Sequence, residues 1–89
     1  MSYRVRIGKK ADKKVRKLPA NSIERIHDAI LKLANDPRPR GCKKLTDSKF
    51  EMWRIRIGEF RVVYSVDDAD RVVLVEDIDK RDKIYRNQD

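Results

Sequence analysis

Three arginines lie close together in this sequence, at Arg54, Arg56 and Arg61. The guanidinium group is a planar, permanently charged fork whose N–H donors match the spacing of phosphate oxygens. Three such groups on one small patch would form a binding site for a polyanion. The alternative is a solvated surface that is basic only because basic residues are abundant throughout the chain.

The arginines belong to a segment with the pattern of a β-hairpin. From Trp53 to Tyr64, apolar residues alternate with polar ones, as in strands that bury one face. Gly58 and Glu59 form a two-residue loop, and glycine in its first position favours a type II′ turn. The expected cross-strand pairs are Ile57 with Phe60, Arg56 with Arg61, Ile55 with Val62, Arg54 with Val63 and Trp53 with Tyr64. One side of the hairpin is then apolar, and the other, the arginine face (Arg54, Arg56 and Arg61), is expected to look outward.

The pairing of Arg56 with Arg61 carries a cost. Like charges directly opposite each other destabilise a hairpin by a few tenths to about 1 kcal/mol. A surface selected only for solubility would place an acid opposite one of these arginines. The pairing therefore favours a site that uses positive charge.

Two short amphipathic helices are expected before the hairpin. Residues 9–18 predict the first helix, which Pro19 ends. The second starts either from a capping box of Asn21 and Glu24 or with Pro19 as its first residue, and it ends near Pro37. The apolar stripes are Ala11, Val15 and Leu18 in the first helix and Ile23, Ile26, Ile30 and Leu33 in the second.

Strands and loops account for the remaining residues. Residues 3–7 alternate between apolar and polar types and predict a first strand. Residues 38–49 form a long irregular stretch that is rich in basic side chains. Residues 71–78 predict a last, interior strand that is apolar on both faces. Glu76 falls on the expected core side of that strand, so either a β-bulge shifts the register or Glu76 is paired.

The order β-α-α-β-β-β predicts the fold class. We expect an α+β domain with a mostly antiparallel four-stranded sheet and two helices packed on one face. A chain of 89 residues has room for one domain, so residues 1–89 are expected to fold as a single unit.

The amino-acid composition restricts the expected cellular location and the kinds of binding partner. The formal net charge of +8 implies an acidic partner such as nucleic acid, an acidic protein or a membrane surface. Cys42 is the only cysteine, so no internal disulfide can form, and we expect Cys42 to have no catalytic role. No apolar run resembles a signal peptide or a membrane span, and a cytoplasmic location without membrane contact is expected. The sequence offers no credible set of metal ligands.

A longer motif around the hairpin resembles a known family. The residues W-R-x-R-x-G-x-F-R-x-x-Y from Trp53 to Tyr64 are followed by Ile78-Asp79-Lys80-Arg81 and then by Tyr85. This ordered set is similar to the RelE/ParE toxin superfamily of type II toxin–antitoxin systems, and it looks most like the RelE branch. The likeness is strongest from Lys44 to Arg86.

The resemblance implies an activity. RelE-like toxins cleave messenger RNA in the ribosomal A site, where the 2′-hydroxyl of the RNA attacks the adjacent phosphate without a metal or other cofactor. The products implied are a 2′,3′-cyclic phosphate and a 5′-hydroxyl. The partners implied are a cognate antitoxin protein, the ribosome and its messenger RNA, with no small-molecule cofactor.

The resemblance also implies roles for individual residues. Arg61 would hold the scissile phosphate, Arg81 would lie near the leaving 5′-oxygen, and Tyr85 would stack on a base or orient the nucleophile, unless Tyr85 only covers the sheet edge. The implied catalytic residues are Arg54, Arg56, Arg61, Arg81 and Tyr85. The implied RNA-binding residues are Lys43, Lys44, Lys80 and Lys83.

Two departures from the family pattern concern proton transfer. Some members have lysines in place of Arg54 and Arg56, and arginine cannot act as a base because its pKa lies above 12. Lys80 stands where a histidine often precedes the arginine. The identity of the general base and acid is therefore open, with Tyr85 or Lys44 as candidates.

Two other functions compete with RNA cleavage. One is a ParE-like toxin that inhibits DNA gyrase by binding alone, and the other is a basic RNA-binding module without toxicity. The full set of four arginines and Tyr85 favours cleavage, because the RelE branch needs all of them and a pure binder does not.

Overall fold

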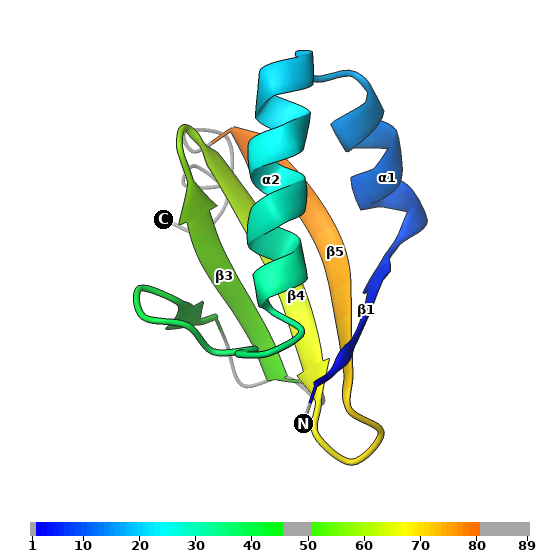
Figure 1. Ribbon diagram of the computed structural model, residues 1–89, viewed down its shortest axis with the longest axis vertical. Helices are drawn as coiled ribbons and strands as arrows, with labels where there is room; N and C mark the ends of the chain where they lie inside the picture. The colour runs from blue at the N-terminus through cyan, green and yellow to red at the C-terminus, as the bar shows by residue number, and fades with distance from the viewer. Residues whose placement is uncertain (1, 46–50, 81–89) are drawn as a thin grey trace.

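The computed structural model describes residues 2–45 and 51–80 (Figure 1). Along the chain, the elements are β1 (Arg4–Ile7), α1 (Lys9–Arg16), α2 (Ala20–Lys32), β2 (Lys43–Lys44), β3 (Glu51–Ile57), β4 (Phe60–Asp67) and β5 (Val72–Lys80). They form a five-stranded sheet in the order β1-β5-β4-β3-β2. The β1–β5 pair is parallel and the other pairs are antiparallel, which confirms the α+β prediction.

The sheet has one strand more than the predicted four. The additional strand is β2, which lies in the stretch 38–49 that we expected to be irregular. Lys43 and Lys44 pair with Arg54 and Trp53 of β3, so the end of this loop extends the edge of the sheet. Two-residue strands carry too little alternation to be recognised from sequence.

Both helices cover the same face of the sheet (Figure 1). The predicted stripes are largely buried: Ala11, Ile26, Ile30 and Leu33 are at most 2% exposed, and Val15 and Leu18 pack against them. On the sheet side, the core consists of Ile55, Phe60, Val62, Tyr64, Val66, Val73, Val75 and Ile78. Helix α2 begins differently from either prediction, because Pro19 is its N-cap residue in an extended conformation and Ala20 is its first residue.

The hairpin has the predicted register. Ile57 pairs with Phe60, Arg56 with Arg61, and the remaining pairs follow down to Trp53 with Tyr64. Gly58 has a positive φ of 61°, and Glu59 does not have a positive φ. A type II′ turn needs a positive φ only at its first central residue, whereas a type I′ turn needs one at both. The loop is therefore a type II′ turn, as predicted. The two-residue loop therefore sets the register of β3 against β4.

A β-bulge resolves the position of Glu76. Val63 pairs with Asp77 and Tyr64 pairs with Val75, so Glu76 is the extra residue on β5. The shift keeps Val75 and Ile78 in the core, although two residues rather than one separate them. It also moves Asp77 and Asp79 to the side of the sheet that carries Arg61.

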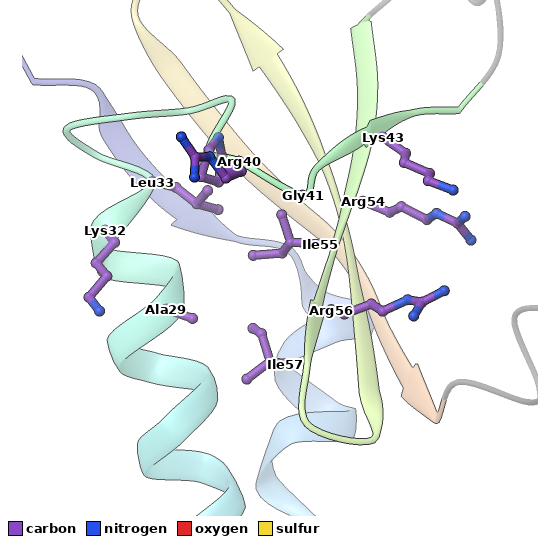
Figure 2. Close-up of a pocket in the computed structure, with 11 residues that line it drawn as sticks. Ala29, Lys32, Leu33, Arg40, Gly41, Lys43, Arg54, Ile55, Arg56 and Ile57 are labelled. Carbon is purple, nitrogen blue, oxygen red and sulfur yellow. The ribbon is translucent and has the colours of Figure 1, made fainter.

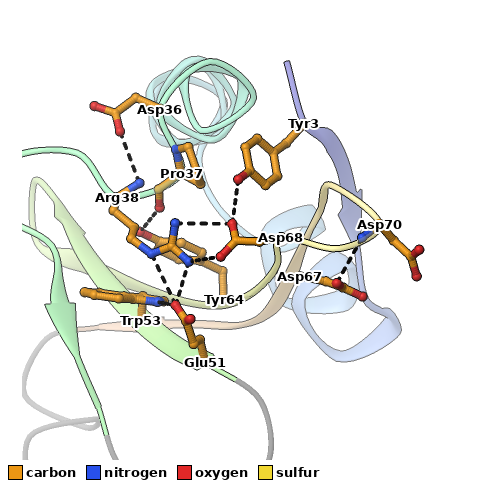
Figure 3. A network of polar contacts seen from close by, with 10 residues as sticks. All are labelled: Tyr3, Asp36, Pro37, Arg38, Glu51, Trp53, Tyr64, Asp67, Asp68 and Asp70. Carbon is orange, nitrogen blue, oxygen red and sulfur yellow. Dashed lines mark hydrogen bonds and ion pairs between the residues drawn. The ribbon is translucent and has the colours of Figure 1, made fainter. Parts of the chain in front are cut away.

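A polar cluster around Arg38 connects four segments of the chain (Figure 3). Its guanidinium lies 2.6 Å from Glu51 Oε1 and 2.8 Å from Asp68 Oδ2, and it stacks 5.5 Å from the centre of the Trp53 ring. The Tyr3 hydroxyl donates to Asp68 and the Trp53 indole N–H donates to Glu51. This Arg38 cluster (Tyr3, Arg38, Glu51, Trp53 and Asp68) thus ties the loop after α2 to β3 and to the β4–β5 turn. From sequence alone, Arg38 is only one of several basic residues in a loop.

The cluster should make folding sensitive to acid. Hydrogen bonds from Arg38 lower the pKa of Glu51 and of Asp68 below their ordinary values of 4.5 and 3.8. A carboxylate with a lowered pKa stabilises the fold above its unfolded pKa, and that contribution is lost as the pH falls through the lower, folded pKa.

We predict that Arg38→Met lowers the free energy of unfolding by about 1–2 kcal/mol at neutral pH, because charge-assisted hydrogen bonds at a partly exposed site are lost. The deficit should be complete above about pH 5 and should shrink below pH 4, where both acids take up protons. Urea unfolding of the wild type and Arg38→Met, from below pH 4 to neutral pH, measures this difference in the free energy of unfolding. Arg16→Met is the control, since the exposed Arg16–Asp12 pair should contribute little. A deficit that does not change with pH would contradict the role given to the two acids.

Candidate RNA-binding face

Three basic side chains lie together on the side of the sheet opposite the helices. Lys43 of β2 pairs with Arg54 of β3, and residues directly opposite in a ladder share one face. Figure 2 shows the side chains of Lys43, Arg54 and Arg56 pointing the same way, away from α2. Arg56 is exposed and Arg54 is half-buried. This group is accessible to a polyanion that approaches the sheet.

Arg61 is not exposed, and the expectation that it looks outward was wrong. Its exposure is 0%, and it is the one charged residue in the buried set of the described part of the chain. The strand order contributes to this burial, because β4 is the central strand and Arg61 has a ladder neighbour on both sides. Arg56 pairs with it from β3 and Asp79 pairs with it from β5. From sequence alone, only the hairpin partner Arg56 can be identified.

Comparisons with known proteins decide the family. The sequence model of the family described as "ParE toxin of type II toxin-antitoxin system, parDE" matches residues 5–85. The chain belongs to this toxin family. A curated relative named RelE1, from Methanocaldococcus jannaschii, is 33% identical over 90 residues, which cover 98% of this chain and 99% of the relative.

Solved structures place the toxin on the RelE side of the superfamily. The archaeal RelE–RelB complex from Pyrococcus horikoshii OT3 matches with a TM-score of 0.82 and 32% identity, over 91% of this chain and 97% of that chain. The RelBE2 toxin–antitoxin complex from Mycobacterium tuberculosis matches with a TM-score of 0.79 and 26% identity, over 91% of this chain and 100% of that chain. The protein is a RelE-like toxin of a type II toxin–antitoxin system, as its motif had indicated.

The other predicted site residues of the toxin fall into two groups. Lys44 pairs with Trp53 and Lys80 pairs with Phe60, and both partners pack in or against the core. The register therefore places Lys44 and Lys80 on the alternate face from Arg54 and Arg56. The predictions for Arg81, Lys83 and Tyr85 lie outside the described residues.

Part of the basic surface of the toxin is engaged in internal ion pairs. Lys14 Nζ lies 2.9 Å from Asp77 Oδ1 and 2.9 Å from Asp79 Oδ2, and Lys10 Nζ lies 3.4 Å from Asp77 Oδ2. Burial lowers the pKa of Lys14, but its hydrogen bonds to Asp77 and Asp79 raise it to a net value above the ordinary one. Sequence spacing could not reveal these pairs, because they depend on the bulge at Glu76.

A groove lies on the helix side of β3. Its volume is about 520 Å³, and its apolar walls include Ala29 and Leu33 from α2 and Ile55 and Ile57 from β3. In Figure 2 these apolar side chains point into the space between α2 and β3, whereas Arg54 and Arg56 point away from it. The lining of the groove also includes Lys43, Arg54 and Arg56, so the groove adjoins the basic face although these side chains point out of it.

The described residues offer few groups for proton transfer. Tyr64 is buried, donates its hydroxyl proton to the Pro37 carbonyl at 2.8 Å, and has a raised pKa mainly because of burial. It cannot serve as a base. No group of three or more His, Cys, Asp or Glu side chains in ranges 2–45 and 51–80 is arranged to hold a metal ion. None of the helices described is long and apolar enough to span a membrane.

We predict that two alanine substitutions on the hairpin differ strongly in their effect on stability. Arg61→Ala should lower the free energy of unfolding by about 2–4 kcal/mol, because it removes a fully buried side chain and leaves a cavity. Arg56→Ala should change it by less than about 0.5 kcal/mol, because Arg56 is exposed. Urea unfolding of both variants measures the difference. Equal stability of the two variants would show that Arg61 is accessible in solution.

Proposed function

We propose that this toxin is a ribosome-dependent endoribonuclease that cleaves messenger RNA in the A site and so inhibits translation. The observation that supports this most is the convergence of Lys43, Arg54 and Arg56 on one face of the sheet, directly beside Arg61. The resemblance of the whole motif to the RelE branch and the solved RelE relatives support the same activity.

The proposed reaction is an internal transesterification. The 2′-hydroxyl oxygen of a nucleotide attacks the adjacent phosphorus, the bond to the 5′-oxygen breaks, and a 2′,3′-cyclic phosphate and a 5′-hydroxyl form. The proton leaves the 2′-oxygen and an equivalent proton reaches the 5′-oxygen. In between, the phosphorane-like transition state carries extra negative charge, which fixed cations stabilise more than the ground state.

The residues have distinct proposed roles. Arg54 and Arg56, with Lys43 beside them, neutralise phosphate charge on the accessible face. Arg61 binds the scissile phosphate in the RNA-bound state, in which its guanidinium must become accessible. Arg81 acts near the leaving 5′-oxygen. Tyr85 orients the nucleophile or stacks on a base.

The same residues explain why the ribosome is needed. General acid–base catalysis contributes roughly 100- to 10,000-fold to rate, yet the described part of the toxin supplies cations rather than an evident base and acid. Correct alignment of nucleophile and phosphate can contribute more than proton transfer does. A ribosome that holds a codon with its 2′-hydroxyl in line with the next phosphate supplies this alignment.

Docking on the ribosome would use basic side chains outside the internal ion pairs described above. Lys9 and Lys13 on α1, Lys17 directly after it and Arg40 in the loop are exposed. They are the side chains that we assign to contacts with the phosphates of ribosomal RNA, and such contacts make binding steeply dependent on salt.

We also propose that a cognate antitoxin binds this toxin. The structural relatives from Pyrococcus horikoshii and Mycobacterium tuberculosis were solved as toxin–antitoxin complexes. Because the net charge of the toxin is +8, we expect the antitoxin segment that binds it to carry acidic residues. A bound antitoxin would block or distort the basic face.

Cleavage is expected to depend on the ribosome. One messenger RNA, incubated with the toxin at matched salt, should be cut on translating ribosomes and should remain intact as naked RNA. The 3′ ends should carry a 2′,3′-cyclic phosphate. Equal cleavage in both tubes would overturn the proposal and would indicate a proton-transfer group on the toxin itself.

Arg56→Ala should reduce the cleavage rate by about 100- to 1000-fold, because one preorganised cation is lost from the transition state. The matched control is Arg6→Ala, which removes one exposed charge from β1 at the far edge of the sheet. Expression of wild type and both variants in a bacterium tests the competing function at the same time. If supercoiling fails before translation, or if Arg56→Ala remains fully toxic, the toxin acts on gyrase or by another route.

A further inference from the structure

The β-bulge at Glu76 decides what lies beside Arg61. Without the extra residue, strict alternation from Val73 and Val75 would direct Asp77 and Asp79 toward the core. With it, Asp79 pairs with Arg61 and Asp77 pairs with Val63. Bulges are known to re-aim side chains next to functional sites. Here the bulge brings an acid into the same row as Arg56 and Arg61.

The two neighbours of Arg61 act on it in opposite ways. Directly paired residues have Cβ atoms about 4.5–5.5 Å apart, so Arg56 repels the Arg61 guanidinium from one side and Asp79 attracts it from the other. A charge with 0% exposure requires a counter-charge in its surroundings. Of the two residues that pair with Arg61 across the ladder, Asp79 is the one of opposite charge.

Asp79 is itself held in place. Beyond Val75, β5 no longer pairs with β1, and α1 packs against this part of the strand. Lys14 Nζ contacts Asp79 Oδ2 and Asp77 Oδ1, both at 2.9 Å. The Asp79 side chain is only 24% exposed. Lys14 thus holds Asp79 Oδ2, and the backbone N–H of Lys80 donates to Asp79 Oδ1 at 2.9 Å.

We propose that Asp79 is a positioning residue for Arg61 and that Lys14 fixes Asp79. The carboxylate orients the guanidinium against the repulsion of Arg56, and guanidinium has five N–H donors, so donors remain for a phosphate. This inference rests on the proposed function, because it gives Arg61 a fixed orientation for the cleavage reaction once its guanidinium becomes accessible. The sequence pattern alone indicates no role for Asp79 or Lys14.

Asp77 provides a matched control. Asp77 and Asp79 have the same exposure, and each accepts a contact of 2.9 Å from Lys14. They differ in their partner on β4, which is Val63 for Asp77 and Arg61 for Asp79. Asp77 also lies 3.4 Å from Lys10 Nζ, whose side chain is 68% exposed. Asp79→Asn and Asp77→Asn each remove one carboxylate charge and one Lys14 contact, but only the first disturbs the row that contains Arg61.

The test measures cleavage of ribosome-bound messenger RNA by each variant. Asp79→Asn should lower kcat by about 10- to 100-fold with KM for programmed ribosomes changed less than about threefold, as expected when the loss falls on the transition state. Asp77→Asn should retain both constants within about threefold. In an Arg61→Lys background, Asp79→Asn should have little further effect, because the group it orients has been replaced. Equal losses in the two asparagine variants, or a full effect in the Arg61→Lys background, would overturn the proposal.

Failure of the proposed function can be told apart from failure of this inference. If wild-type toxin cuts no messenger RNA on ribosomes, the function is wrong and urea unfolding tests the pairing instead. The unfolding midpoint of Asp79→Asn should then fall below that of Asp77→Asn, and this difference should disappear in the Arg61→Lys background. A difference that persists there, or no difference at all, would show that Asp79 does not orient Arg61.

Discussion

The two-residue turn at Gly58 and Glu59 is the constraint on which the rest of the structure depends. Side chains alternate along a strand, so a slip of one residue would turn Arg56 and Arg61 toward the helices and Ile55 toward solvent. The turn prevents this because its geometry requires a positive φ, which Gly58 adopts at 61°. A Cβ atom at this position would also lie 3.0 Å from the Arg25 guanidinium of α2. The conformation of this turn thus determines which side chains of the hairpin enter the core and which form the basic face.

Local chemistry explains why much of the fold could be predicted. The register of β3 against β4 depends on neighbours in sequence, and the apolar stripes of the helices depend on spacings of three and four residues. Both are visible in the chain and both are confirmed. The RelE likeness was visible for the same reason, since its residues follow one another along the hairpin and the last strand.

The features that escaped prediction depend on contacts between distant residues. The buried Arg61 has a second neighbour because β5 lies on the other side of β4, and nothing within the hairpin reveals that neighbour. The acids that Arg38 binds are 13 and 30 residues away along the chain. The bulge at Glu76 was visible as a conflict in the apolar pattern, but only the sheet shows that Asp79 then pairs with Arg61. Sequence located the arginines, and tertiary packing divides them into exposed and buried groups.

The basic residues of the molecule also divide into those that form internal ion pairs and those that point outward. The ion pairs of Arg38 lie near the start of β3, and those of Lys14 lie along the outer edge of β5. Each ties a loop or a helix to the sheet, so acidic side chains stabilise the two flanks of the molecule. Lys43, Arg54 and Arg56 lie on β2 and β3 and point away from α2, where a positive field attracts phosphate and raises the rate of encounter. Mutual repulsion among these residues would loosen an isolated hairpin, and the surrounding five-stranded sheet resists that loosening. A cation site on a rigid sheet needs little reorganisation when the negative charge of a transition state develops, which is the condition under which electrostatic stabilisation is largest.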